Sequence, residues 1–581
     1  MRNSGRVALG TLAGATLAAV IAPLIRPLFS APKGGVGFLT VTAYPKSWDY
    51  AVIALLIAGA FTGGALLSGA PAPSPVHAGE APAPHRGRKA WITAVVVFIL
   101  MLFIHDHPYA LIEPFHEGEH LTAGWLMKSG ARPFGDFYIF HGLATDAALD
   151  ALVLGDPPSP LHVRRQQTIL DALTLALLVP IAVELTTTSA AMIAGVVASL
   201  CAMAALWLPL FPFYRLLPVH VALLALLRYR RSGRGLWLAF AASTLGILWS
   251  LDTGMYALIS VAICFVVLRA ARLEEVPLPL SRVIAYATIA AVLPIVVLFA
   301  VHADVHQFFI DSFVIMPRAI DAVWSLPAPK PFALEGIRYY LPPVFYGFLF
   351  ALAFVAWRRG ERANAARLVI VAVFSVLLFR TASGRVSWAH TRFSMPLLGI
   401  AVVAFVIEPL LRNRQRIAAI ALIVPLFFYF EIAQNFAAGA KLLAGWRARQ
   451  RHEGLVRYPF ATGKGIYATP QNAADLAALN GMIGPGTILD LSNERALYYL
   501  LQRRAPIRCM EISMLSVPRL FDEAMAQLEA HPPACVILEG FPEVLKYDGL
   551  SNRERVPALA AWIDARYPNR RHVGRFLVAV P

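Results

Sequence analysis

Residues 91–142 read WITAVVVFILMLFIHDHPYALIEPFHEGEHLTAGWLMKSGARPFGDFYIFHG, an apolar run followed at once by a polar segment. The run is typical of a helix that crosses a membrane. The polar segment that follows it is rich in acids and histidines, namely Asp106, Glu113, Glu117, Glu119 and Asp136, with His105, His107, His116, His120 and His141. Ionisable groups are expensive to desolvate at the edge of a bilayer, so this density indicates either a functional site or a wet surface.

The composition extends this pattern to the whole chain. Of its 581 residues, 58% are hydrophobic and 15% are charged, whereas a soluble domain averages roughly 25% charged residues. Apolar runs recur along most of the chain, which predicts a polytopic α-helical membrane protein with about 13 spans. The first run is interpreted as a retained span rather than a cleaved signal peptide, because it is long and no clear cleavage site follows. The predicted spans are 7–29, 49–70, 90–105, 168–187, 189–207, 216–230, 235–251, 255–271, 282–301, 342–357, 367–380, 393–410 and 415–432.

The basic residues give the predicted orientation. The net charge of +16 would suggest nucleic-acid binding in a soluble protein. Here the arginines concentrate in alternate loops, which the positive-inside rule assigns to the cytoplasm. The N-terminus is then cytoplasmic, and the C-terminal segment is extracytoplasmic.

Three regions are predicted. Residues 1–89 form two N-terminal helices and a Pro/Ala-rich linker. Residues 90–433 form the transmembrane core with large outer loops at 106–166 and 302–341, and residues 434–581 form a small extracytoplasmic α/β domain. In this domain, strands are predicted at 487–491, 534–538 and 575–580, and helices at 493–502 and 518–528. Cys509 and Cys535 could form a disulfide there, and no Gly-rich phosphate loop follows the strands.

The segment HEGEH holds two candidate general bases, Glu117 and Glu119. Their side chains share one side only if the segment is extended, and they diverge if it is helical. A carboxylate here could deprotonate a hydroxyl group, or it could be an ordinary solvated loop acid. HEGEH also fits the zinc-binding pattern HExxH, which requires a helix and a third ligand. Gly118 and Pro114 argue against a helix, so a divalent metal is not favoured.

Further polar residues are predicted to lie on the same outer face. Asp136 and His141 follow a short helix of the first loop that is predicted to end at Gly130. Asp252 begins a span, where it could order an acceptor or pair with an outer arginine. The stretch RTASGRVSWAHTRFSMP holds Arg380, Arg385 and His390. Arginines at an outer membrane edge suit a phosphate group, although a snorkelling role is the alternative.

Four segments carry a family resemblance: FHEGEHLTAGWLMKSGARPFGDFYIFHG, LDTGMYAL, GRVSWAH and DLSNERALYYLLQRRAP. Together they resemble the GT-C superfamily of polyprenol-phosphate-sugar-dependent glycosyltransferases, and within it the bacterial protein-mannosyltransferase/ArnT-like group with RgtA/B/C/D-type domains. The matching segments lie between residues 90 and 581, and the first two spans are outside them. The first segment is moderately specific, and the others are weak individually.

The resemblance implies a membrane enzyme of the bacterial inner membrane. It would move a hexosyl or pentosyl group from a polyprenyl-phosphate donor to a glycan, lipid or protein acceptor on the outer face. The transfer would invert the anomeric configuration. The resemblance does not assign a cofactor. The base would be Glu117 or Glu119, since His116 stands where the family has the first acid of a pair. The implied substrate-binding residues are His116, Asp136, His141 and Asp252, with Arg380, Arg385 and His390 for the donor phosphate.

Two other functions fit the same topology. A transporter or lipid flippase would show internal repeats and ionisable groups in mid-span, which the sequence lacks. A non-catalytic envelope-assembly protein would use the outer loops and the C-terminal domain only for binding.

Overall fold

The computed structural model describes most of the chain. The described residues are 2–28, 46–68, 84–105, 112–186, 213–319, 323, 326–330, 332–386, 388–429, 431, 437, 440, 441, 444, 454–546 and 549–581. The predicted span 189–207 and the loop residues 106–111 lie outside them.

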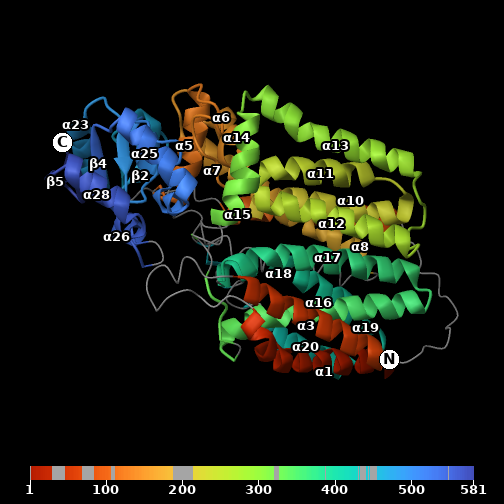
Figure 1. Ribbon diagram of the computed structural model, residues 1–581. Helices are drawn as coiled ribbons and strands as arrows, with labels where there is room; N and C mark the ends of the chain where they lie inside the picture. Colours follow the sequence, from red (N-terminus) through yellow and green to blue (C-terminus); the bar gives the residue numbers. More distant parts are fainter. Residues whose placement is uncertain are drawn as a thin grey trace.

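Long apolar helices run side by side through one half of the molecule (Figure 1). Seven helical stretches of the described chain are long and apolar enough to cross a membrane. They are α1 (Arg2–Ile25), α3 (Ser47–Leu67), α7 with α8 (Pro160–Ala176 and Leu178–Leu185), α12 (Leu251–Ala270), α13 (Leu280–Ala300), α16 (Leu334–Arg358) and α17 (Arg362–Gly384). Further helices in the bundle are α4 (Pro84–His105), α10 (Leu217–Ser232), α11 (Leu236–Trp249), α18 (Trp388–Val402), α19 (Glu408–Arg412) and α20 (Arg416–Tyr429). The polytopic helical prediction is therefore supported, and the count of 13 spans stays a prediction.

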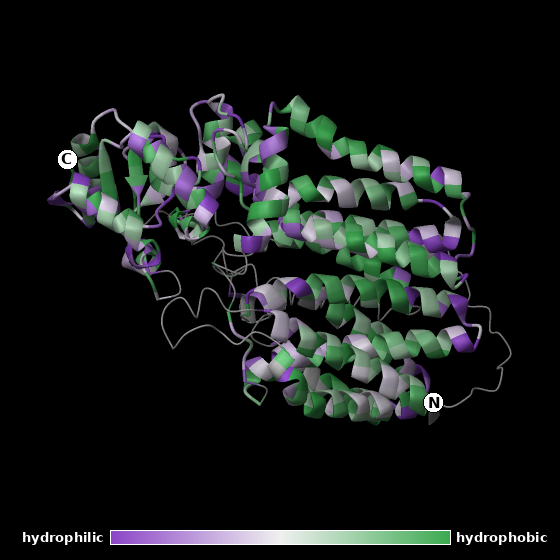
Figure 2. Cartoon of the chain, viewed as in Figure 1, coloured by the Kyte–Doolittle hydropathy of each residue, from purple (hydrophilic) through white to green (hydrophobic). Residues whose placement is uncertain are grey.

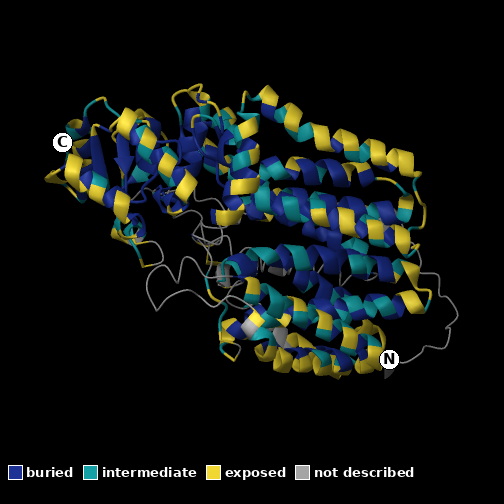
Figure 3. Ribbon diagram, viewed as in Figure 1, coloured by how far each residue is buried: buried dark blue, intermediate teal, exposed yellow. Residues whose placement is uncertain are grey.

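The outward faces of these helices are apolar and exposed. Figure 2 shows α13 as predominantly hydrophobic, and Figure 3 shows much of the same helix as exposed. Ile289 and Phe299 of α13, for example, are 62% and 66% exposed. A helix that presents such side chains outward is suited to lipid contact rather than to water.

The first two helices pack closely through small residues. A Cβ atom built on Gly14 of α1 would lie 2.0 Å from the carbonyl oxygen of Gly59 of α3, so these backbones touch. Helix α3 in turn packs on α16, where a Cβ on Gly347 would lie 2.5 Å from the Ile57 carbonyl oxygen. Small residues of this kind let membrane helices approach without side chains between them.

The C-terminal segment forms an α/β domain beyond one end of the bundle (Figure 1). Its four-stranded sheet has the order β3-β4-β6-β5. Strands β3 (Ile488–Asp490) and β4 (Cys535–Glu539) are parallel, and β6 (Phe576–Val580) is antiparallel to β4 and to β5 (Asn569–Val573). The other elements are β1 (Val456–Arg457), β2 (Tyr467–Ala468), α23 (Pro470–Ile483), α24 (Ala496–Leu501), α25 (Pro518–Ala530), α26 (Pro542–Leu545), α27 (Asn552–Arg555) and α28 (Pro557–Arg566).

The predicted strands and helices of this domain agree with the structure to within a few residues. The helices α23 and α28 and the strand β5 were not predicted. The disulfide that the sequence left open is not formed: among the residues that the structure describes, Cys509 and Cys535 are both buried free thiols. Cys509 follows Arg508, whereas Cys535 lies in the central strand β4. The two thiols are buried in different hydrophobic clusters.

The outer loops pack against this domain. The first loop contains α5 (His116–Lys128), the π-helical turn η2 (Ala144–Ala148) and α6 (Leu149–Val153), and the second contains α14 (Val305–Ile310), η5 (Asp311–Ile315) and α15 (Met316–Ala319). As predicted, the first helix ends before Gly130, whose left-handed φ of +84° terminates it. Leu121 and Phe137 of the loop share one hydrophobic core with Leu497 and Ile537 of the domain.

Candidate functional site

The segment HEGEH forms the first turns of α5, so Glu117 and Glu119 diverge. Gly118 between them is required by close packing, because a Cβ atom there would lie 2.2 Å from the backbone nitrogen of Ala496 in the C-terminal domain. Pro114 precedes the helix and does not interrupt it. The two residues that argued against a helix therefore sit at its start and at its contact with α24.

Glu117 is held on both carboxylate oxygens. The Arg164 guanidinium at the start of α7 donates to Oε1 at 2.5 Å and to Oε2 at 2.8 Å, and the Glu113 amide donates to Oε2 at 2.9 Å. The side chains of Glu117 and Arg164 are each 13% exposed. This bidentate pair fixes the beginning of α5 against α7.

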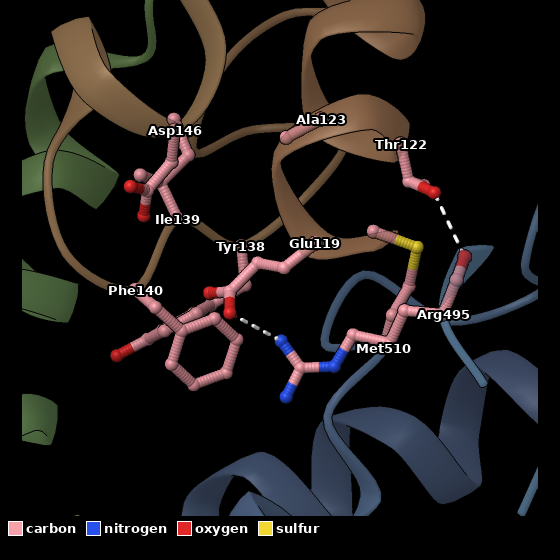
Figure 4. A pocket seen from close by; sticks show the side chains of 9 residues that line it. All are labelled: Glu119, Thr122, Ala123, Tyr138, Ile139, Phe140, Asp146, Arg495 and Met510. Atoms are coloured by element: carbon pink, nitrogen blue, oxygen red, sulfur yellow. Dashed lines mark hydrogen bonds and ion pairs between the residues drawn. The ribbon is translucent and has the colours of Figure 1, made fainter. Parts of the chain in front are cut away.

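Glu119 points the other way, into a small cavity between the first loop and the C-terminal domain (Figure 4). Arg495 of the domain lies 2.9 Å from its Oε2. The other oxygen, Oε1, is buried and accepts no hydrogen bond from the described residues. Burial raises the pKa of Glu119 above its ordinary value, although the Arg495 charge opposes that rise. A carboxylate with a raised pKa and one available oxygen is suited to proton transfer near neutral pH.

The cavity beside Glu119 has polar and aromatic walls. Its lining residues are Glu119, Thr122, Ala123, Tyr138, Ile139, Phe140, Asp146, Arg495 and Met510. It offers space for about one water molecule. Asp146 faces Glu119 from the opposite side of the first loop (Figure 4).

The two histidines of HEGEH contact different carboxylates. His116 Nδ1 lies 3.4 Å from Glu113 Oε2. His120 Nδ1 lies 3.6 Å from Asp150 Oδ2 and 3.7 Å from Asp146 Oδ1, and it is 3.0 Å from the Thr145 carbonyl oxygen. Within the described ranges, no group of three His, Cys, Asp or Glu residues is arranged to hold a metal ion. The two histidines of the helical HExxH pattern therefore contact separate carboxylates rather than one common site.

His120 was not singled out from the sequence. Burial alone would lower its pKa, but the carboxylate of Asp150 at 3.6 Å, with the charges of Asp146 and Glu119, raises it to about 9. The Tyr214 hydroxyl lies 3.5 Å from Nε2 on the other side of the ring. The acids Asp146 and Asp150 come from the segment after His141, so only the folded loop reveals this network.

A pH dependence of stability follows from His120. Because its folded-state pKa is raised above the unfolded value of about 6.5, its stabilising contribution is complete below pH 6.5 and is lost as the pH rises through about 9. We expect the melting temperature of the detergent-solubilised protein to fall over this window. In His120→Gln that part of the slope should disappear, and an unchanged slope would show that His120 is neutral in the fold.

The backbone of His141 lies against the start of α12, beside Asp252. The His141 amide donates to Asp146 at 2.7 Å, and its carbonyl accepts from the Leu251 amide at 2.5 Å, next to Asp252. Burial lowers the pKa of His141 well below its ordinary value, and the charge of Arg215 acts in the same direction. His141 is therefore neutral at pH 7.

Arg215 forms an ion pair with Asp252. Its guanidinium donates to Asp252 at 2.8 Å and to the Ser250 hydroxyl at 3.0 Å. The Asp252 carboxylate also accepts from the Thr253 amide at 2.8 Å. The predicted ion pair of Asp252 with an outer arginine is therefore present.

Arg385 and His390 lie close to the pair of Arg215 and Asp252. Burial lowers the pKa of His390 well below its ordinary value, and the charges of Arg385 and Arg215 act in the same direction. Arg215 and Asp252 thus lie near both His141 and the stretch that holds Arg385 and His390.

Arg380 lies near the C-terminal end of α17 and packs on an aromatic ring. Its Cζ atom lies 4.4 Å from the centroid of the Tyr50 ring, which belongs to α3. Within the described part of the chain, no carboxylate forms an ion pair with Arg380. A half-buried guanidinium without an acidic partner is suited to an incoming anion.

Asp136 lies apart from these groups. Its side chain is 44% exposed, and it accepts hydrogen bonds from the Arg132 amide at 2.7 Å and the Arg132 guanidinium at 3.3 Å. It closes a surface turn of the first loop.

Comparisons with known proteins found similar solved structures, two of which are described below. No protein-family model matches the chain, and no curated protein matches it in sequence. The chain is similar to the crystal structure of ArnT from Cupriavidus metallidurans bound to undecaprenyl phosphate, with 15% identity, a TM-score of 0.47, and coverage of 84% of this chain and 97% of that chain. It is also similar to the apo structure of the same protein, with 15% identity, a TM-score of 0.44, and coverage of 85% and 98%.

Proposed function

We propose that this chain is a multi-pass membrane glycosyltransferase. It would move a sugar from a polyprenyl-phosphate donor to a glycan, lipid or protein acceptor of the cell envelope, on the outer face of the bacterial inner membrane. The N-terminus would be cytoplasmic, and the C-terminal domain would be extracytoplasmic. The motif resemblance to the GT-C superfamily supports this class of reaction.

The observation that carries the proposal is the buried carboxylate of Glu119 at the same end of the bundle as a group of cations. Glu119 has one oxygen with no hydrogen-bond partner among the described residues. Arg380 packs on an aromatic ring without an acidic partner in the described chain. A base and an anion-binding group are what transfer from a lipid phosphate requires.

In the proposed reaction, Glu119 accepts the proton of an acceptor hydroxyl group. The hydroxyl oxygen forms a bond to the anomeric carbon of the sugar, and the bond between that carbon and the phosphate oxygen breaks. Polyprenyl phosphate leaves as an anion, and Arg380, Arg385 and His390 stabilise its charge. One displacement of this kind inverts the anomeric configuration.

Glu119 is the better base of the two predicted glutamates. Both oxygens of Glu117 are occupied, by Arg164 and by the Glu113 amide. An acceptor would have to displace a bidentate arginine to reach Glu117, whereas Oε1 of Glu119 has no partner among the described residues to displace. We therefore assign Glu117 to the structure of the loop.

A transfer assay tests the proposed function. Membranes that contain the wild-type protein are incubated with polyprenyl-phosphate-linked sugars, labelled on the sugar, and with an envelope fraction as acceptor. We expect label to pass to the acceptor in the wild type and not in a Glu117→Gln/Glu119→Gln double variant. No transfer with any donor would refute the enzyme, and lipid or ion flux that survives the double substitution would establish a transporter.

The stacking of Arg380 on Tyr50 gives a separate prediction for the donor. A cation–π contact contributes about 0.5–2 kcal/mol, so Tyr50→Ala should raise the KM for the donor by about 2- to 30-fold with little change in kcat. Tyr50→Phe keeps the ring and should behave as the wild type. Equal donor KM values in all three proteins would exclude Arg380 from donor binding.

A further inference from the structure

One side chain of the C-terminal domain enters the candidate site. Arg495, immediately before α24, is 3% exposed and lies 2.9 Å from Glu119 Oε2. Its guanidinium also pairs with Glu511 of the same domain. A single arginine therefore joins a carboxylate of the domain to a carboxylate of the first loop.

Aromatic rings of the loop enclose the same guanidinium. Its Cζ atom lies 4.4 Å from the Phe115 ring centroid and 5.0 Å from that of Phe140. Contacts of this kind stabilise a desolvated cation and limit its movement. Two carboxylates therefore pair with the guanidinium, and two aromatic rings pack against it.

The backbone around Arg495 is fixed to the loop as well. The Thr122 hydroxyl donates to the Arg495 carbonyl oxygen at 2.8 Å, and the Ala496 amide donates to the Pro114 carbonyl oxygen at 3.0 Å. Gly118 allows this approach, because any side chain there would overlap the Ala496 backbone. These contacts set where Arg495 stands relative to α5.

We propose that Arg495 is a positioning residue for Glu119, supplied by the C-terminal domain, so that the candidate site is complete only when this domain is docked on the first loop. This inference rests on the proposed function, in which Glu119 is the general base. Arg495 holds one carboxylate oxygen and leaves the other directed into the cavity. Its charge also favours the ionised form of the buried carboxylate, which is the form that can accept a proton.

The positive charge of Arg495 acts to lower the pKa of Glu119. Burial raises the pKa of Glu119, and the Arg495 charge limits that rise. Without this charge the carboxylate would ionise only at higher pH, and the enzyme would become active only at higher pH. An opposite charge at this distance shifts a carboxyl pKa by about 1–3 units.

The experiment measures the pH–rate profile of purified protein in nanodiscs with labelled polyprenyl-phosphate sugar. In Arg495→Gln we expect kcat to fall and the donor KM to stay near that of the wild type. The rising limb of the profile, in which kcat increases with pH, should move to higher pH by about 1–3 units. Arg495→Lys restores a positive charge and should return the limb toward its wild-type position. Arg503→Gln is the matched control, because Arg503 donates to the Gly484 and Leu501 carbonyl oxygens inside the same domain.

A second variant covers the case in which Arg495→Gln does not fold. Glu511 shares the Arg495 guanidinium with Glu119, so Glu511→Gln strengthens the remaining pair and should move the limb to lower pH. Opposite shifts in the two variants, or this downward shift alone, support the inference. An unmoved limb in every folded variant, with transfer still lost in Glu119→Gln, would overturn the role of Arg495 and leave the proposed function intact. Absence of transfer in the wild type would instead refute the proposed function.

Discussion

Glu119→Gln is expected to reduce kcat for sugar transfer by about 10²- to 10⁴-fold, the usual contribution of a general base. Glutamine keeps the shape of the side chain and can still accept a hydrogen bond from Arg495, but it cannot take the proton of the acceptor. Since the donor phosphate would bind at Arg380 and Arg385, the donor KM should change little. Steady-state transfer with saturating acceptor measures both constants.

Glu117→Gln is the matched comparison on the same helix. Its carboxylate pairs with Arg164 and accepts a hydrogen bond from the Glu113 amide just before α5, so we expect a lower melting temperature and a kcat well above that of Glu119→Gln. The reverse order, with Glu117→Gln inactive and Glu119→Gln active, would move the base to Glu117.

Arg508→Ala should produce the largest loss of stability. Arg508 donates to Asp311 of the second outer loop at 2.5 Å and 3.2 Å, to Glu523 of α25 at 2.6 Å and 3.0 Å, and to the Phe134 carbonyl oxygen of the first loop at 3.0 Å. The Asp311 side chain is only 1% exposed. Removing one partner of a buried ion pair costs about 3–5 kcal/mol, because the remaining charge stays buried without compensation.

Thermal unfolding of the detergent-solubilised protein measures this loss. Arg508→Ala should lower the melting temperature by several degrees, and adding Asp311→Asn should recover part of it by removing the uncompensated charge. Arg553→Ala is the control, since its pair with Asp564 is 35% and 49% exposed and such pairs contribute about 0–1 kcal/mol. Equal melting temperatures for the Arg508 and Arg553 variants would show that Arg508 does not join the two loops to the domain.

The sequence predicted features that depend on local patterns. Apolar runs of about 20 residues predicted long helices because the backbone in a bilayer must satisfy its own hydrogen bonds. Short apolar runs that alternate with helical segments along the chain predicted the strands β3, β4 and β6. Gly130 predicted the end of α5 because only glycine readily adopts the left-handed conformation found there.

Features that depend on distant residues were not predictable. Arg164 is 47 positions from Glu117, and Arg495 and Arg508 reach the outer loops from the C-terminal domain. The sequence did not decide whether HEGEH is extended or helical, because Gly118 was interpreted as a helix breaker. In the structure, the small size of Gly118 is needed for the contact with Ala496. The network around His120 also escaped notice, since Asp146 and Asp150 meet it only after the loop folds back.

The most direct measurement is a cryo-EM structure of Glu119→Gln in nanodiscs with an intact polyprenyl-phosphate sugar, because this variant should bind the donor without consuming it. The account predicts phosphate density beside Arg380, Arg385 and His390, with the anomeric carbon of the sugar directed toward the side chain at position 119. Density for the phosphate elsewhere on the protein would contradict the account. A sugar directed toward Glu117, with Phe140 between the sugar and residue 119, would also contradict it.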